Sequence, residues 1–269
     1  MNNEIIELLS KANSGNADSQ NQLGDAYFDG IGIEQDHAKA FEWYLRAAEQ
    51  GHGKAQYNVA YAYANGIGAQ KNTSEAIKWY GKSADQGIAL AEYVLAKMFI
   101  GGQYIEQDLT KGLDLLHKAS NQGLDHAQYD LGTIYLEGKI AVPDEGMGIS
   151  LLTLAADQGH KEAQFNLGLA YSNLPEPNYP HAEKYLREAS FNGHFKAMLE
   201  LSRLYTINMR DSKQGLLWAI VALEYCDKQD EQRIKRIKNN LERKLSTAEY
   251  EAVSYEAKET IAKLDASLC

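Results

Sequence analysis

The sequence is poor in cysteine and proline, and both shortages limit the folds that it can adopt. Its two cysteines, Cys226 and Cys269, form no framework of paired spacings, which excludes a small disulfide-stapled domain. We expect Cys226 to be a buried free thiol. The four prolines all fall in predicted loops or in a first helical turn: Pro143, Pro175, Pro177 and Pro180. None interrupts a predicted helix interior, where each would cost about 3 kcal/mol.

Long apolar runs and an excess of basic residues are also missing. No run approaches the roughly 20 apolar residues of a membrane-spanning helix, so we expect no membrane insertion. The segment Met1–Leu9 has no basic start, which predicts a cytoplasmic protein. A net charge of -10 disfavours nucleic acid and anionic lipid as partners. Residues 227–269 carry nine acidic and nine basic side chains, so the acidic excess lies on residues 1–226. That excess favours a neutral or basic partner, although solubility alone also explains it.

Patterns typical of catalysis or metal binding are absent too. Gly30-Ile31-Gly32 and Gly66-Ile67-Gly68 look like parts of a phosphate loop, but they follow predicted helices in a repeating turn. No histidine pair stands four residues apart with a carboxylate partner, and no Cys–His signature or nucleophile elbow occurs. We therefore expect no enzyme activity, no cofactor and no metal.

What the sequence does contain is a repeat of 36 residues. Five glycines follow one another at that interval and a sixth comes after 34: Gly15, Gly51, Gly87, Gly123, Gly159 and Gly193. A small residue follows four positions after most of these glycines, and an apolar–small pair begins four positions later. An aromatic residue comes three positions after the small member of that pair. These spacings place the side chains on one face of a helix, which we name helix A.

Each helix A is followed by a second helix, which we name helix B. Gly30, Gly66, Gly102 and Gly138 suit the left-handed conformation after a helix end. Residues with capping oxygens then open helix B: Asp36, Asn72, Asp108, Asp144, Asn178 and Asp211. Small residues opposite bulky ones let neighbouring helices approach closely. The pattern predicts an all-α fold.

These units resemble Sel1-like repeats, which are relatives of tetratricopeptide repeats. The resemblance rests on stretches such as QLGDAYFDGIGIEQDHAKAFEWYLRAAEQG (22–51) and AQYNVAYAYANGIGAQKNTSEAIKWYGKSADQG (55–87), and it covers residues 17–226. It implies a right-handed α-α superhelical solenoid of about six helix-turn-helix repeats. The expected parts are a capping helix at 3–14, repeats at about 17–54, 55–90, 91–126, 127–162, 163–196 and 197–226, and a C-terminal capping pair at 227–269.

The C-terminal pair has two interpretations. Residues 229–245 are highly charged, with apolar spacing at Ile234, Ile237, Leu241 and Leu245, and Thr247 caps a last helix. End repeats need a polar outer face, so a solvated cap is expected. Seven basic against three acidic residues between Lys228 and Lys244 instead suit a docking face.

The resemblance also implies that helix A of each repeat lines a concave, partner-binding groove. Two sets of residues flank the apolar position of helix A. The first set is Asn21, Tyr57, Tyr93, Tyr129, Phe165 and Leu199. The second set is Asp25, Tyr61, Lys97, Thr133, Leu169 and Arg203. Tyrosine and arginine dominate binding hot spots, but aromatics of the first set also suit packing between repeats.

Two functions fit this architecture. The leading hypothesis is a non-catalytic adaptor or scaffold that binds a partner protein in its groove. The alternative is a bacterial immunity protein that neutralises a cognate toxin, for which the acidic body suits a basic toxin domain. A small hydrolase or carbohydrate-binding module is the remote third option. The sequence leaves the partner and the oligomeric state open.

Overall fold

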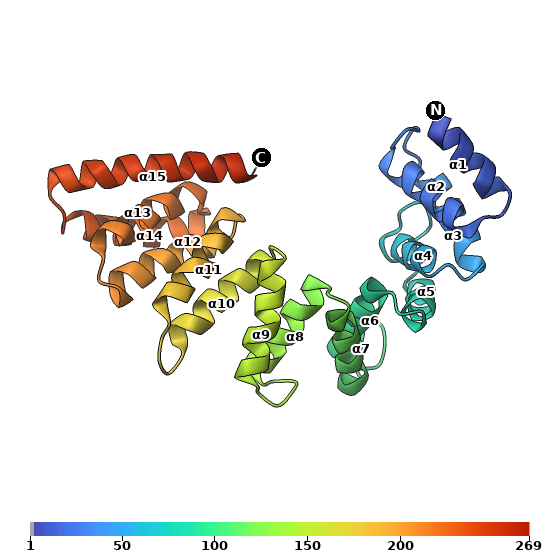
Figure 1. Cartoon of the computed structure of the whole chain (residues 1–269), viewed down its shortest axis with the longest axis horizontal. Coiled ribbons are helices and arrows are strands. Elements are labelled where there is room, and N and C mark those ends of the chain that lie inside the picture. The colour runs from blue at the N-terminus through green and yellow to red at the C-terminus, as the bar shows by residue number, and fades with distance from the viewer. Residues whose placement is uncertain (1–2, 269) are drawn as a thin grey trace. The chain divides into compact units, whose positions relative to one another are not determined.

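The computed structural model describes residues 3–268, which contain fifteen α-helices and one π-helical turn and no strand. Successive helices pair as antiparallel hairpins (Figure 1). The helices A are α2 (Ala17–Asp29), α4 (Gly53–Asn65), α6 (Ala89–Gly101), α8 (Asp125–Glu137), α10 (Lys161–Asn173) and α12 (Phe195–Arg203). The helices B are α3 (His37–Glu49), α5 (Thr73–Asp85), α7 (Leu109–Asn121), α9 (Glu145–Asp157), α11 (Tyr179–Phe191) and α13 (Ser212–Tyr225). The predicted all-α repeat fold is confirmed.

Helices before and after the repeats also lie where the pattern placed them. They are α1 (Asn3–Asn13), α14 (Lys228–Glu242) and α15 (Thr247–Leu268). The chain forms two compact units, residues 1–127 and 128–269, and the boundary falls within α8. Within residues 3–268, every helix is too short or too polar to cross a membrane.

The predicted helix ends are confirmed. Gly30, Gly66 and Gly102 follow α2, α4 and α6 with φ between 64° and 74°, and each donates its backbone N–H to the carbonyl four residues earlier. All six predicted caps of helix B accept a backbone N–H with their side-chain oxygen. Such caps are worth about 1 kcal/mol each.

Small residues on helix A let helix B approach closely. A Cβ on Gly24 would lie 2.5 Å from the ring of Tyr44, and one on Gly168 would lie 2.5 Å from Leu186. Tyr44 and Leu186 are both buried against these glycines. The predicted opposition of small and bulky residues therefore holds the two helices of a repeat together.

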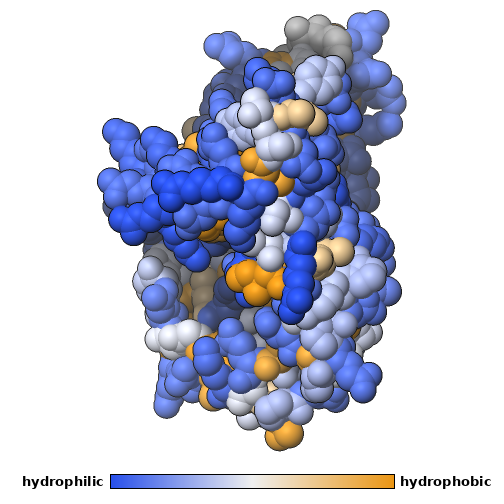
Figure 2. All heavy atoms as spheres, turned by 90° about the vertical axis from the view of Figure 1, so that its left-hand side faces the viewer, coloured by the Kyte–Doolittle hydropathy of each residue, from blue (hydrophilic) through white to orange (hydrophobic). Residues whose placement is uncertain are grey.

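The last helix pair departs from the others. Helix α12 continues into a π-helical turn, η1 (Leu204–Asn208), after which Met209 donates its backbone N–H to the Leu204 carbonyl. Most of α13 is buried, and Trp218 is fully buried in an apolar core that α11, α12 and α13 share with α14 and α15. Of the apolar positions predicted on α14, Ile234 and Leu241 are buried. The surface that the C-terminal helices present is mainly hydrophilic, with apolar residues in small separate groups (Figure 2).

Cys226 is free but only half-buried, so the expectation of a buried thiol is wrong. It stands just after α13 has ended, in extended backbone, which leaves one side of the thiol open. Partial burial raises the pKa of Cys226, which makes the thiol less reactive. Cys269 lies outside the described residues.

A ladder of side-chain hydrogen bonds to buried acceptors joins the helices within each unit. In the first five helices A, the fourth residue accepts a hydrogen bond of 2.6–2.8 Å from the residue that directly follows helix B of the same repeat. The pairs are Gln20–Gln50, Gln56–Gln86, Glu92–Gln122, Gln128–Gln158 and Gln164–Asn192.

Three of these buried residues also bind the preceding helix. The Gln20, Gln56 and Gln164 amides donate to the carbonyl eight residues earlier, at distances of 3.0–3.2 Å. Gln56 and Gln164 thus fix one repeat against the previous one, and Gln20 fixes the first repeat against α1. An unmade hydrogen bond at such a buried position is costly.

Replacing Gln56 with Leu tests the ladder. The change removes two hydrogen bonds of a buried side chain, although the Ala48 carbonyl keeps the Gly51 N–H and the Gln86 amide keeps the Lys82 carbonyl. At about 1 kcal/mol for each lost bond, we expect the free energy of unfolding to fall by about 2 kcal/mol. Urea denaturation followed by circular dichroism measures this. Gln70→Leu makes the same chemical change at an exposed loop position and should cost less than about 0.5 kcal/mol. Equal losses in the two variants would contradict the role of the ladder.

Glu92 is the one carboxylate among the ladder acceptors, and replacing it with a neutral residue is expected to stabilise the fold. Burial raises the pKa of Glu92 above its ordinary 4.5, although Lys118 and the bond from Gln122 oppose the rise. The folded state therefore binds this proton more tightly than the unfolded state. As pH rises from 4.5 through the raised pKa, ionisation of Glu92 lowers the free energy of unfolding.

We expect Glu92→Gln to raise the free energy of unfolding at pH 7 by about 1 kcal/mol, because a neutral amide can donate to the Ala84 carbonyl as its counterparts do. The gain should shrink as pH falls toward 4.5, where Glu92 itself becomes protonated. Urea titrations at several pH values measure both effects. A pH-independent difference, or a loss at pH 7, would contradict the argument.

Candidate protein-binding surface

In the first unit, three of the predicted groove residues meet at one pocket. Asp25 on α2 and Tyr57 and Tyr61 on α4 line a cavity of about 280 Å³. The other residues that line it are Phe28, Asp29, His37, Ala40, Phe41, Tyr44, Asn58, Ala62 and Ile67. We name this cavity the acidic pocket, because Asp25 and Asp29 are its charged residues. Its size is at the lower end for ligand sites and suits one side chain.

Asp25 is held in place by neighbouring donors. The Tyr44 hydroxyl donates to Asp25 Oδ1 at 2.8 Å, and Asn21 Nδ2 donates to Oδ2 at 3.1 Å. Asn58 Nδ2 donates to Asn21 Oδ1 at 3.1 Å. Burial raises the pKa of Asp25, while the bond from Tyr44 lowers it. The half-buried carboxylate is thus oriented within a pocket whose lining residues include no Lys or Arg.

Aromatic rings form much of the remaining wall. The rings of Tyr57 and Tyr61 are stacked at 6.5 Å between centroids, and Tyr57 also packs on Tyr80 at 5.6 Å. Tyr61 is 39% exposed. His37 packs on Phe28 at 5.0 Å, and its buried Nδ1 has no hydrogen-bond partner among residues 3–268. A carboxylate beside exposed aromatic faces is an arrangement that attracts a cation.

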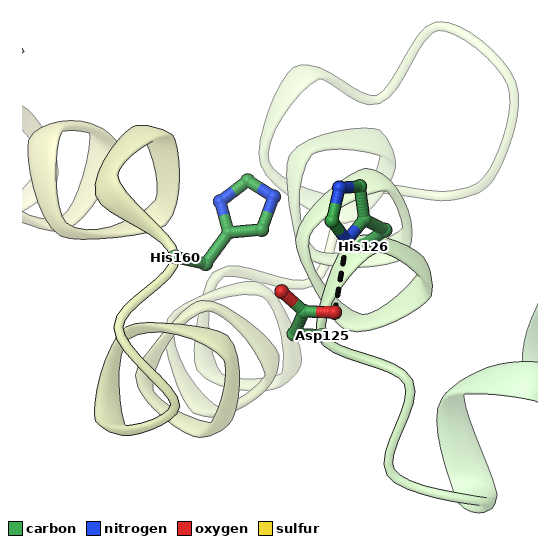
Figure 3. A group of neighbouring side chains, drawn as sticks. All are labelled: Asp125, His126 and His160. Carbon is green, nitrogen blue, oxygen red and sulfur yellow. Dashed lines mark hydrogen bonds and ion pairs between the residues drawn. The ribbon is translucent and has the colours of Figure 1, made fainter. Parts of the chain in front are cut away.

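The other aromatics of the first set pack on a histidine at the start of the next helix A. In the second unit, Tyr129 stacks on His160 at 4.6 Å and Phe165 stacks on His194 at 4.3 Å. In the first unit, Tyr93 meets His126 edge-on at 6.2 Å, and His126 Nδ1 lies 2.8 Å from Asp125 Oδ1 (Figure 3). All three aromatics are half-buried. Packing between repeats therefore accounts for much of their surface.

Two members of the first set do not face solvent. Asn21 and Leu199 are only 7% and 8% exposed, so their expected position in the groove is wrong. Asn21 is drawn inward by its hydrogen bond to Asp25, and Leu199 packs in the apolar core of the second unit.

The second set divides between exposed and half-buried residues. Tyr61, Lys97 and Arg203 are exposed, whereas Asp25, Thr133 and Leu169 are half-buried. Lys97 Nζ lies 5.6 Å from the centre of the Tyr93 ring. Arg203 lines a different pocket, in the second unit.

Three histidines recur after turn glycines, and two of them cap the following helix, a role that the sequence pattern did not predict. His52 and His160 cap α4 and α10, since their Nδ1 atoms accept the backbone N–H of Ala55 and Ala163. His194 precedes α12 without such a bond, and burial lowers its pKa. Their place directly after the turn glycine was the signal available in the sequence.

A comparison with protein-family models confirms the resemblance. The model described as Sel1 repeat matches residues 17–52, 53–88, 89–124, 125–160 and 161–194. The chain belongs to the Sel1 repeat family. The five matches fall on the helix pairs from α2–α3 to α10–α11, and the sixth predicted repeat, α12–α13, lies beyond them.

Solved structures with the Sel1 fold are similar to this Sel1 repeat protein. A Sel1 repeat protein from Oxalobacter formigenes is 24% identical, with a TM-score of 0.65, over 90% of this chain and 97% of that one. A protective antigen of uropathogenic Escherichia coli is also 24% identical, with a TM-score of 0.60, over 97% of this chain and 64% of that one. At these identities the likeness shows the fold alone.

An immunity protein from Pseudomonas aeruginosa, Pa5087, is 25% identical over 84% of this chain and 81% of that one. Its TM-score of 0.47 is too low to carry an inference about function. A search of curated protein sequences found no match.

The acidic pocket yields a prediction about ionisation. Tyr44→Phe removes the hydroxyl that holds the pKa of Asp25 down, so we expect Asp25 to titrate at a higher pH than in the unmodified chain. Carbon-13 NMR of the side-chain carboxyl groups measures this. Tyr27→Phe is the control, because Tyr27 lies on the same helix as Asp25 without a hydrogen bond to it. An unchanged or lower pKa in Tyr44→Phe would show that the hydroxyl does not stabilise the carboxylate.

Proposed function

We propose that this Sel1 repeat protein is a non-catalytic binding module that holds a basic segment of a partner protein in its acidic pocket. The observation that carries the proposal is the meeting of Asp25, Tyr57 and Tyr61 in one cavity. A Lys or Arg side chain that enters it places its cation beside Asp25 and its stem against the two rings. The net charge of -10 supports the same choice of partner, because it attracts basic segments at long range.

The chemistry of the pocket favours a cation over an apolar anchor. A cation against an aromatic face contributes about 0.5–2 kcal/mol, and a charge-assisted hydrogen bond to a carboxylate is about twice as strong as a neutral one. Tyr44 and Asn21 already hold the Asp25 carboxylate in place, so binding a partner loses little side-chain entropy at this residue. Tyr93, Lys97, Tyr129, Thr133, Phe165, Leu169 and Arg203 remain candidates for further contacts.

An adaptor and an immunity protein both need such a surface. An adaptor binds several partners with modest affinity, whereas an immunity protein binds one toxin very tightly. The stoichiometry and the dissociation constant of a captured partner therefore distinguish the two roles.

The proposal is tested with the partner captured from a lysate of the source organism and then purified. We expect Tyr61→Ala to weaken its binding by about tenfold or more, because the variant removes one aromatic wall of the pocket. Isothermal titration calorimetry measures the change. Tyr255→Ala is the matched control, since Tyr255 is 66% exposed on α15 and lies outside the acidic pocket.

Circular dichroism of both variants establishes that they fold. Equal affinities for the unmodified chain and Tyr61→Ala would overturn the assignment of the pocket. A captured partner whose affinity is unaffected by replacing its Lys and Arg residues would overturn the choice of a basic segment.

A further inference from the structure

A second pocket lies in the second unit, where the repeats meet the C-terminal helices. It has a volume of about 390 Å³ and is bounded by α12, the π-helical turn η1 and α14. We name it the basic pocket. The residues that line it are Leu199, Glu200, Ser202, Arg203, Thr206, Ile207, Arg233, Ile237, Asn240, Leu241 and Lys244.

Its charge is opposite to that of the chain as a whole. Arg203 Nε forms an ion pair with Glu200 Oε2 at 2.6 Å, so these two charges compensate each other. Arg233 and Lys244 line the same cavity, are exposed, and have no ion-pair partner among residues 3–268. Two uncompensated cations thus border one pocket of a protein with a net charge of -10.

Apolar side chains lie between these cations. Leu199 and Leu241 are buried at the pocket, and Ile237 is half-buried. Ile207 borders the cavity and is 63% exposed, so it is open to a partner. The surface therefore offers an apolar contact flanked by positive charge.

The π-helical turn supplies part of this wall. Its wider backbone carries Thr206 and Ile207, and Arg210 then adopts a positive φ of 58°. A non-glycine residue in that region is strained, and π-helical turns occur frequently at functional sites. Helix α12 thus departs from the regular repeat where it borders the basic pocket.

Helix α14 presents a matching face. Arg233, Ile237, Asn240 and Leu241 are spaced by four, three and one residues, which places them along one side of the helix. Lys244 lines the cavity from the turn that follows α14. Arg236 on α14 and Arg243 just after it are exposed and do not line the cavity. The basic face of residues 228–244 is therefore divided, and only part of it borders the pocket.

We propose that the basic pocket binds an acidic segment of a protein, in which one apolar side chain is flanked by Asp or Glu residues. The apolar side chain contacts Ile207 and Ile237, and the flanking carboxylates pair with Arg233 and Lys244. Nucleic acid and anionic membranes are disfavoured because the acidic surface of the chain repels an extended polyanion. This assignment does not rest on the acidic pocket, which lies in the other unit.

A library of random peptides displayed on phage, selected against the whole chain, tests the assignment. We expect one class of selected peptides to carry an apolar residue between acidic residues. Fluorescence anisotropy of the labelled peptides then compares the unmodified chain with Arg233→Glu and Lys244→Glu, each of which should weaken binding by about tenfold or more. Arg236→Glu makes the same change of charge on the same helix outside the pocket, and should weaken binding by less than about threefold.

Three results would overturn the proposal. The first is a selection that yields no acidic peptides, and the second is equal loss of affinity in Arg236→Glu and the two pocket variants. The third is preferential binding of another occupant at these residues: a second copy of the chain, detected by sedimentation, or an oligonucleotide or anionic vesicle that displaces the peptides. The selection can also yield peptides rich in Lys or Arg. If their binding is lost in Tyr61→Ala, they bind the acidic pocket and do not count for or against the basic pocket.

Discussion

Buried Gln and Glu side chains join the first five helices A to their neighbours within a unit, and the stacking of the repeats depends on them. Apolar packing between repeats is strong but has little direction, whereas a buried amide must find a donor and an acceptor in fixed places. Gln56 accepts from Gln86 and donates to the Ala48 carbonyl, so it sets the register of one repeat on the previous one. The proposed binding surfaces keep their shape because this register is fixed.

Much of the fold follows from the spacing of a few residues. The turn glycines and the caps such as Asp36 and Asn72 mark nearly every helix end, because both act through local backbone geometry. The ladder was not predicted, although Gln20, Gln56 and their counterparts recur at 36-residue intervals. A polar residue in a helix is ambiguous without the structure, since an exposed glutamine gives the same pattern as a buried one.

The binding surfaces were harder to predict because they combine several helices. Asp25 and Tyr61 were found from their place on helix A, but Tyr44, which orients Asp25, lies on helix B and had no signal in the groove pattern. Leu199 followed the helix A pattern and is nevertheless buried, because the C-terminal helices cover the last repeat. The π-helical turn at Leu204–Asn208 could not be predicted, because no residue type in this segment is typical of a π-helix.

Photocrosslinking in the source cells tests most directly whether the acidic pocket holds a partner. The photoreactive residue p-benzoylphenylalanine is placed at position 61 in one variant and at position 255 in another, so that both probes replace exposed tyrosines. The account predicts a covalent adduct with a partner protein from position 61 and none from position 255. An adduct from position 255 alone, or equal adducts from both, would contradict it.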